Sequence, residues 1–376
     1  MVDVNGTCDE RFRALEEQFR ANLEQGLDKG ASLAVTLHGE SVVDLWGGTT
    51  DWGQTQPWTE DTLVRVFSTS KVMVMVTVLL VVDRGLLDLD APIAEYWPEF
   101  ARHGKGAVTC RQVLLHKSGL PGFGRTVTFL EVADYDNAIH LLEDAELWYE
   151  PGTVSCYHPF TFGHLLAEPI RRITGVPFDE FFHREFAEPL GAEFHFRLTS
   201  PDDSTRVAQL WPAAKEPDLP SEMGTRAMSE VVATTEWIDT KQLAAFSPAS
   251  SGITNGRAMA RVGAMLAQGG ELDGRRYIRR SSIEDACREH SYQEDQVLGT
   301  MRLGLGFGLD SPEFPAPTPS TFHWGGYGGS FLTMDLESGI SCGFAQNQLS
   351  IGDEFGDDPR LRAFWSILGD ISRSLA

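Results

Sequence analysis

The sequence predicts an α/β chain of the α+β kind, in which an antiparallel sheet is flanked by N- and C-terminal helices and joined to a mostly helical lobe. Three observations predict it. A helix and two strand-like segments open the chain, a similar set closes it, and helical patterns fill the middle. We expect one structural unit over residues 1–376, with 1–66 and 300–376 forming the sheet lobe and 67–299 the helical lobe.

The first elements are an amphipathic helix and a hairpin. Apolar residues recur at spacings of three and four before Gly30 ends the helical pattern. The stretch SLAVTLHGESVVDLWGG then places β-branched and apolar residues on both sides of a turn at His38, Gly39 and Glu40, as a β-hairpin requires. The apolar residues of the helix are Phe12, Leu15, Phe19, Leu23 and Leu27.

The C-terminal segment mirrors this arrangement. SFLTMDLESGISCGFAQN indicates two strands around a turn at Glu337, Ser338 and Gly339, and an amphipathic helix follows. Both ends of the chain are therefore expected to belong to one sheet covered by helices. The apolar residues of the closing helix are Leu361, Phe364, Trp365, Leu368 and Ile371.

The middle of the chain carries helical patterns such as RAMARVGAMLAQGGELDG, cut by Pro and Gly loops. Residues 198–245 lack clear periodicity, and residues 311–320 indicate a Pro-rich loop. Long irregular segments inside a compact domain often form the walls of a site.

Charge and composition restrict the partners. The sequence has 31 Lys and Arg against 54 Asp and Glu, a formal charge of -23 that repels nucleic acid and anionic membranes. The first residues show no apolar secretion signal, and the longest mostly apolar run, 72–82, is too short to span a bilayer. We expect a cytoplasmic protein that binds neither nucleic acid nor membrane.

Cysteine and histidine spacing indicates no metal site. The five cysteines are widely scattered without metal-ligand spacing, and we interpret them as reduced packing residues. His116 and His323 also lack such spacing and are interpreted as structural. No metal and no cofactor is expected.

The segment VFSTSKVMVMVTVLLVVDRG, residues 66–85, carries the first chemical signal. On a helix, Ser68 shares a face with Lys71 whereas Ser70 points elsewhere. A lysine can take the proton of a serine hydroxyl if its pKa falls from about 10.4 toward neutrality, and burial at the edge of an apolar run lowers it. A helix N-terminus at Ser68 would also aim backbone N–H groups at a developing oxyanion.

Two further segments accompany this one. WYEPGTVSCYHPFTFGHLLAE sets Tyr157 after a Pro-Gly turn, where a phenol could project into a cleft. FHWGGYGGSFLTMD is a glycine-rich entry into a strand, where the backbone can approach a substrate closely.

In this order the segments resemble the serine β-lactamase-related, penicillin-recognising hydrolases, and most of all the family VIII carboxylesterases. VTCRQVLLHKSGLPGF and SSGITNGRAMARVGAML are similar to two further stretches of the family, so the likeness covers nearly the whole chain and implies the β-lactamase/transpeptidase-like fold. The matched positions are Ser68-Thr69-Ser70-Lys71 for S-x-x-K, Tyr157-His158-Pro159 for the tyrosine motif, and Trp324-Gly325-Gly326 for the box that the esterases show as WGG.

The resemblance implies roles for these residues. Ser68 would be the acylated nucleophile, Lys71 and Tyr157 a coupled base and acid, and the N–H groups of Ser68 and Tyr327 the oxyanion hole. Which of Lys71 and Tyr157 takes the first proton stays open. The expected substrate-binding residues are His158, Trp324, Gly325, Gly326 and Tyr327.

The sequence departs from the family's pattern in two places. His158-Pro159 replaces x-Asn, whose side chain would hydrogen-bond near Lys71; Pro159 cannot donate, so either His158 substitutes or the contact is absent. Trp324 stands where lactam-handling relatives place a Lys or His, and a neutral indole cannot attract the substrate carboxylate as a cation would. This favours a neutral ester.

The leading interpretation is a serine carboxylesterase acting on a small-molecule ester through an acyl-enzyme on Ser68. The alternatives are an acyltransferase or amidase using the same acyl-enzyme, a weak β-lactamase, or a catalytically silent relative that only binds a ligand. Joint retention of Ser68, Lys71 and Tyr157 argues against the silent relative. The physiological ester and its acyl-chain length stay open, and a homo-oligomer is compatible with the sequence.

Overall fold

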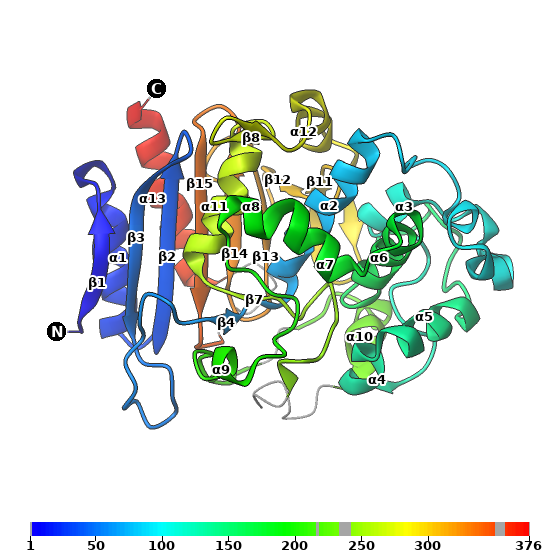
Figure 1. Ribbon diagram of the computed structural model, residues 1–376, viewed down its shortest axis with the longest axis horizontal. Helices are drawn as coiled ribbons and strands as arrows, with labels where there is room; N and C mark the ends of the chain where they lie inside the picture. Colours follow the sequence, from blue (N-terminus) through cyan, green and yellow to red (C-terminus); the bar gives the residue numbers. More distant parts are fainter. Residues whose placement is uncertain (1, 216–217, 233–241, 350–357, 376) are drawn as a thin grey trace.

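A nine-stranded antiparallel sheet forms the centre of the protein, shown in Figure 1. The computed structural model describes residues 2–215, 218–232, 242–349 and 358–375. The strands follow the order β1-β3-β2-β15-β14-β13-β12-β11-β10. Their bounds are β1 Val4–Cys8, β2 Gly30–Leu37, β3 Glu40–Gly48, β10 Ser291–Asp295, β11 Gly299–Leu303, β12 Gly308–Leu309, β13 Thr321–Gly325, β14 Phe331–Asp335 and β15 Ile340–Gln346.

Both predicted hairpins are present, and they meet at the middle of the sheet. β2 pairs with β3 across a turn in which His38 and Gly39 have positive φ, and β14 pairs with β15 across the turn that contains Gly339. β15 also pairs with β2, so strands from the two ends of the chain lie side by side. This confirms the expectation that both termini belong to one sheet.

The two edge strands of the large sheet lie where the sequence predicted none. β1 (VNGTC) pairs with β3 at the edge of the sheet, and its exposed polar residues give little strand signal. β10 lies within the segment expected to be mostly helical and forms the opposite edge by pairing with β11.

Helices cover both faces of the sheet (Figure 1). On one face α1 (Arg13–Glu24) packs against α13 (Pro359–Leu375) over a core of aromatic and aliphatic side chains. On the other face α11 (Gly256–Ala267) contacts β2, β14 and β15. The approach is close at Gly343 of β15, where a β-carbon would stand 2.8 Å from the backbone nitrogen of Ala260.

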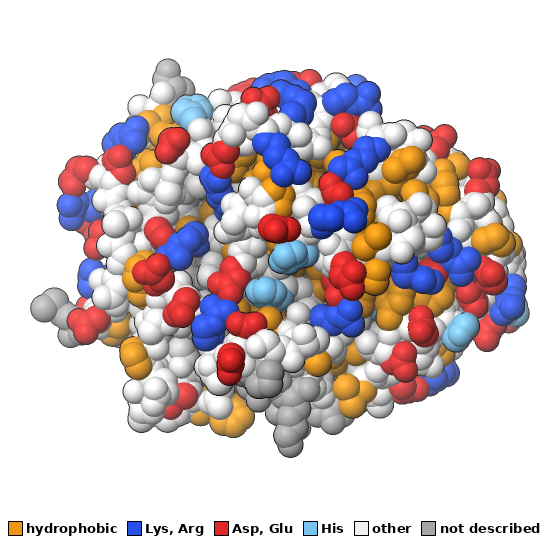
Figure 2. All heavy atoms as spheres, viewed as in Figure 1, with side chains coloured by type: hydrophobic (Ala, Val, Ile, Leu, Met, Phe, Trp, Pro, Cys, Tyr) orange, Lys and Arg blue, Asp and Glu red, His pale blue; other side chains and the backbone are white. Residues whose placement is uncertain are grey.

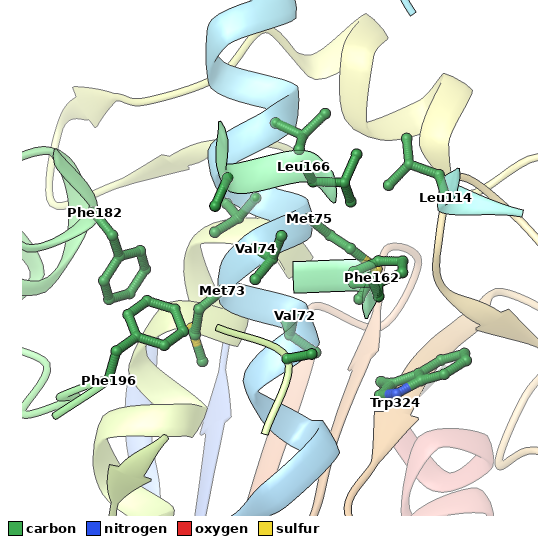
Figure 3. Close-up of a cluster of buried hydrophobic side chains, with 14 of the residues drawn as sticks. Val72, Met73, Val74, Met75, Leu114, Phe162, Leu166, Phe182, Phe196 and Trp324 are labelled. Atoms are coloured by element: carbon green, nitrogen blue, oxygen red, sulfur yellow. The ribbon is translucent and has the colours of Figure 1, made fainter. Parts of the chain in front are cut away.

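The helical lobe is built around α2 (Lys71–Asp83), whose residues from Lys71 to Val81 are all buried. A helix that is apolar on every side has to be surrounded by other elements. Figure 3 shows Val72, Met73, Val74 and Met75 of this helix among labelled side chains from several segments. Those neighbours are Leu114, Phe162, Leu166, Phe182, Phe196 and Trp324.

The remaining elements have the following bounds. The helices are α3 Cys110–Leu114, α4 Phe129–Ala133, α5 Tyr135–Asp144, α6 Thr161–Thr174, α7 Phe178–Phe182, α8 Glu188–Leu190, α9 Pro201–Ser204, α10 Glu222–Ser229 and α12 Arg280–Ala286. The 3-10 segments are η1 Glu10–Phe12, η2 Phe67–Ser70, η3 Ile93–Glu95 and η4 Pro98–Ala107, and η5 His183–Ala187 is a π-turn. Three two-stranded ladders pair β4 Val64–Arg65 with β7 Ile253–Thr254, β5 Val127–Thr128 with β6 Val231–Val232, and β8 Glu271–Leu272 with β9 Arg275–Arg276.

The segment 198–245, expected to be irregular, contains α9, α10 and β6. Within it, 216–217 and 233–241 lie outside the described residues. The Pro-rich segment 311–320 has neither helix nor strand, as predicted, and Phe314 packs its ring on His323 and Trp365.

On the face of the molecule shown in Figure 2, acidic and basic side chains are interspersed. Many form ion pairs, such as Arg257 with Asp44 and Arg206 with Glu193. All five cysteines are free thiols. No described helix combines the length and the apolar character that crossing a bilayer requires.

Candidate active site

A strained turn precedes α2. Phe67 has a φ of 45°, in the left-handed region that bulky residues rarely adopt, and Ser68 follows it directly. The hydroxyl of Ser70 donates to the carbonyl of Phe67 at 2.5 Å and accepts from the N–H of Gly252 at 2.9 Å. Both hydrogen bonds of the Ser70 hydroxyl therefore hold the turn, and such bonds keep a strained backbone in place.

Ser68 lies between an amine and a phenol. Its Oγ is 3.2 Å from Nζ of Lys71 and 2.6 Å from the hydroxyl of Tyr157. The i, i+3 spacing places Ser68 and Lys71 on one face, as the sequence predicted, and Ser70 faces away from the amine toward Gly252. The three side chains named by the first two motifs are thus brought together.

Lys71 is fully buried. Its Nζ donates to the backbone carbonyls of Pro159 at 2.9 Å and Ala249 at 3.2 Å, and it lies 4.7 Å from the centre of the Tyr157 ring. Burial holds the pKa of this amine well below its ordinary value, because the charged form loses its hydration. Neutral acceptors compensate only part of that loss, so burial favours the uncharged amine.

The pKa of the Tyr157 phenol is shifted in the opposite direction to that of the Lys71 amine. Burial raises its pKa above the ordinary value, while hydrogen bonds with Ser68 and Trp324 lower it in part. The net pKa is raised, so the phenol stays protonated at neutral pH. Tyr157 can therefore donate a proton in this site but is a poor first acceptor.

His158 does not take the place of the missing Asn. Its Nδ1 lies 2.6 Å from the carbonyl of Cys156 and its Nε2 2.6 Å from the hydroxyl of Ser118. Burial lowers its pKa to about 3, so the ring is neutral, and a carbonyl can only accept; the proton is on Nδ1. At the position of the Asn, the backbone carbonyl of Pro159 accepts from Lys71 instead. Every residue has such a carbonyl, so the sequence did not predict this contact.

His116, interpreted from sequence as structural, forms part of the wall of this site. Its Nδ1 accepts from the N–H of His158 at 3.2 Å, and its ring centre lies 4.9 Å from that of Tyr157 and 5.7 Å from that of Trp324. Burial lowers its pKa well below the ordinary value. A single loop histidine has no sequence spacing that would have placed it there. His323 packs its ring 4.6 Å from that of Trp365, in the outer layer.

The third motif meets the first across the turn between β13 and β14. A β-carbon on Gly326 would stand 2.1 Å from the carbonyl oxygen of Val66, so the two backbones touch. The ring of Tyr327 packs edge-on against Phe67 at 5.5 Å, and the hydroxyl of Ser330 donates to the Val66 carbonyl at 2.9 Å. This turn, which also contains Gly325, therefore lies against the turn that carries Ser68.

Arg360 of α13 supports this turn from the outer layer of the protein. Its Nη2 donates to the carbonyl of Gly328 at 2.6 Å, and its guanidinium is paired with Asp28 at 2.5 Å and Asp358 at 2.6 Å. Arg360 and Asp28 are almost completely buried. Nothing in the sequence pattern of α13 distinguishes this arginine from a surface charge, so the sequence did not predict its role.

Across the ranges that the structure describes, no three His, Cys, Asp or Glu side chains gather as metal ligands. The site consists of a hydroxyl, an amine, a phenol, neutral imidazoles and an indole. Such a set can exchange protons and form an ester bond to serine.

Three known proteins are similar to this chain over most or all of its length. The chain is 33% identical over 368 residues to the Esterase/beta-lactamase LipL of Mycobacterium tuberculosis, covering 92% of this chain and 83% of that protein. A crystal structure of a family VIII carboxylesterase matches with a TM-score of 0.91 and 35% identity over 100% of both chains. A penicillin-binding protein homologue from Caulobacter crescentus matches with a TM-score of 0.89 and 32% identity, again over 100% of both.

The family model described as Beta-lactamase matches residues 19–364. The predicted fold and the predicted kinship with β-lactamase-related hydrolases, including family VIII carboxylesterases, are thereby confirmed. The chain belongs to the β-lactamase family.

Proposed function

We propose that this protein is a serine carboxylesterase that transfers the acyl group of a neutral small-molecule ester first to Ser68 and then to water. The observation that carries the proposal is the position of the Ser68 hydroxyl, 3.2 Å from a buried amine and 2.6 Å from a buried phenol. The names of two relatives, an esterase/β-lactamase and a family VIII carboxylesterase, support ester substrates.

Lys71 is the first base in this mechanism. Burial lowers its pKa and so favours the uncharged form, whose lone pair takes the Ser68 proton as Oγ forms a bond to the ester carbonyl carbon. The raised pKa of Tyr157 makes that phenol unsuited to the same step. The two opposite pKa shifts support the proposal that Lys71, and not Tyr157, takes the first proton.

The negative charge then resides on the former carbonyl oxygen. We assign its stabilisation to the backbone N–H groups of Ser68 and Tyr327, which belong to the two turns in contact. As the tetrahedral intermediate collapses, the ester C–O bond breaks and the leaving alkoxide takes a proton from Tyr157, which recovers one from the Lys71 ammonium. Water attacks the acyl-enzyme by the same proton route in reverse order and releases the carboxylic acid.

Trp324 favours esters over lactams. Its indole is nearly buried beside Tyr157, so it presents no positive charge to a substrate carboxylate. An ester's alcohol diffuses away after acylation, whereas the amine of a β-lactam stays attached to the acyl group and obstructs water. Slow lactam hydrolysis is the second candidate activity, since the name of the relative LipL includes β-lactamase.

The test compares short-chain p-nitrophenyl esters with nitrocefin. We expect multiple turnovers of the esters and, with nitrocefin, at most slow hydrolysis or a long-lived adduct. Acid-quenched samples of the ester reaction should contain the acyl group on the peptide that includes Ser68. Equal kcat/KM for the two substrate classes would contradict the interpretation of Trp324, and transfer of the acyl group to added alcohols in preference to water would indicate an acyltransferase.

A further inference from the structure

Asp295, at the end of β10, is a buried carboxylate that the mechanism above does not use. It is 1% exposed and accepts four hydrogen bonds. Oδ2 accepts from the hydroxyl of Ser155 at 2.8 Å, and Oδ1 accepts from the backbone N–H groups of Tyr157 at 3.2 Å, Val297 at 2.9 Å and Leu298 at 3.0 Å. All four partners donate, which is the pattern that an ionised carboxylate requires.

These bonds attach the main chain before Tyr157 to the edge of the sheet. Ser155 forms an isolated parallel bridge with Asp295, and the N–H of Gln296 donates to the Ser155 carbonyl at 3.0 Å. Tyr157 itself lies in a stretch with neither helix nor strand, between the turn at 151–153 and α6. Its backbone therefore depends on contacts with other segments for its position.

We propose that Asp295 is a positioning residue for Tyr157, which fixes the main chain so that the phenol meets Ser68. The inference rests on the proposed function, because it assigns Asp295 an effect through Tyr157. Buried carboxylates that accept several backbone N–H groups hold a chain segment firmly, since each of those donors would otherwise be buried without a partner.

The charge of Asp295 adds only to an effect that burial already produces. Burial is the larger cause of the raised pKa of the Tyr157 phenol, and Asp295 raises it further. The role proposed for Asp295 is therefore positional and rests on the hydrogen bond from the backbone N–H of Tyr157.

A double-mutant cycle separates positioning from general support of the fold. The measurement is kcat/KM for a short-chain alkyl ester, because its alkoxide leaving group needs the proton that Tyr157 supplies. We expect Asp295→Ala to lower kcat/KM by about 10- to 100-fold in the wild-type background but by less than about threefold in Tyr157→Phe, since residues that act as one unit are not additive. Ser155→Ala should show the same pattern with a smaller loss, and it carries the test if the Asp295→Ala protein does not fold.

Asp295→Asn tests the charge alone. The amide oxygen can still accept from the backbone N–H groups, and its NH2 can donate to the hydroxyl of Ser155, so the position of Tyr157 is kept. We expect kcat/KM within about threefold of wild type, because the main chain at Tyr157 keeps its hydrogen bonds. Glu143→Gln is the matched control: Glu143 is a buried carboxylate that accepts from Trp97 in the helical lobe, so its loss should leave kcat/KM unchanged.

If Asp295→Ala slows the reaction equally in both backgrounds, and Tyr157→Phe is itself impaired, the role of Asp295 is overturned. The proposed function would stand in that case. An Asp295→Asn protein that is as slow as Asp295→Ala would also overturn the role of Asp295. A Tyr157→Phe protein with the wild-type kcat/KM for the alkyl ester would instead overturn the proposed function at Tyr157, and with it the inference drawn from it.

Discussion

The backbones of Gly326 and Val66 touch so closely that a β-carbon on Gly326 would stand 2.1 Å from the carbonyl oxygen of Val66. The same carbonyl accepts the hydroxyl of Ser330 at 2.9 Å. This contact holds the turn with Tyr327 against the turn with Ser68, so the two proposed oxyanion donors have one fixed geometry.

Gly326→Ala should therefore reduce kcat by about 100-fold or more, because losing one oxyanion donor already costs on that order. Gly325→Ala is the matched control. A β-carbon there would meet its nearest atom, the Ser330 carbonyl oxygen, at an ordinary 3.5 Å, so the loss should be much smaller. Steady-state kinetics on a p-nitrophenyl ester checks both, and equal kcat values for the two variants would contradict the role of the contact.

The pH dependence of kcat/KM should show an acidic limb that belongs to Lys71. Burial lowers the pKa of this amine, and the base must be neutral to accept the Ser68 proton. Activity is therefore present above the lowered pKa of Lys71 and lost as the pH falls through it, far below the usual lysine value of about 10.4.

A thermal unfolding series over the same pH range shows whether the limb reports catalysis and not loss of the fold. Activity that stays constant or increases as the pH is lowered from neutrality, in protein that remains folded, would contradict Lys71 as the base.

Arg360→Met should destabilise the protein by about 3–5 kcal/mol, because removing one partner of a buried ion pair leaves charges without compensation. Here the side chains left behind are Asp28 and Asp358, both buried. Arg373→Met, on the same helix α13, removes an exposed pair with Asp370 and should change the free energy of unfolding by less than about 0.5 kcal/mol. Urea unfolding measures both, and similar values for the two variants would show that the buried cluster does not stabilise the fold.

Much of this arrangement is predictable from sequence because its signals are local. The two hairpins follow from alternating residues around glycine turns, and the approach of Ser68 to Lys71 follows from the i, i+3 spacing. The buried helix α2 follows from an apolar run without a polar face.

The remaining contacts connect distant segments through groups that carry no residue signature. Lys71 donates to the backbone carbonyl of Pro159, 88 residues away, and every residue has such a carbonyl. Arg360 and Asp28 are separated by 332 residues, and Asp295 and Tyr157 by 138. Arg360, Asp28 and Asp295 look in the sequence like ordinary solvated side chains, and only the folded chain shows that they are buried.

The most direct test of the account is fluorophosphonate labelling of three proteins: wild type, Ser68→Ala and Ser70→Ala. Labelling should occur in wild type and disappear in Ser68→Ala. Ser70→Ala should still be labelled, at a reduced rate, because Ser70 only holds the turn through Phe67 and Gly252. Intact mass and peptide mapping give the result: a label on Ser68 in wild type and Ser70→Ala supports the account, and a label that persists in folded Ser68→Ala contradicts it.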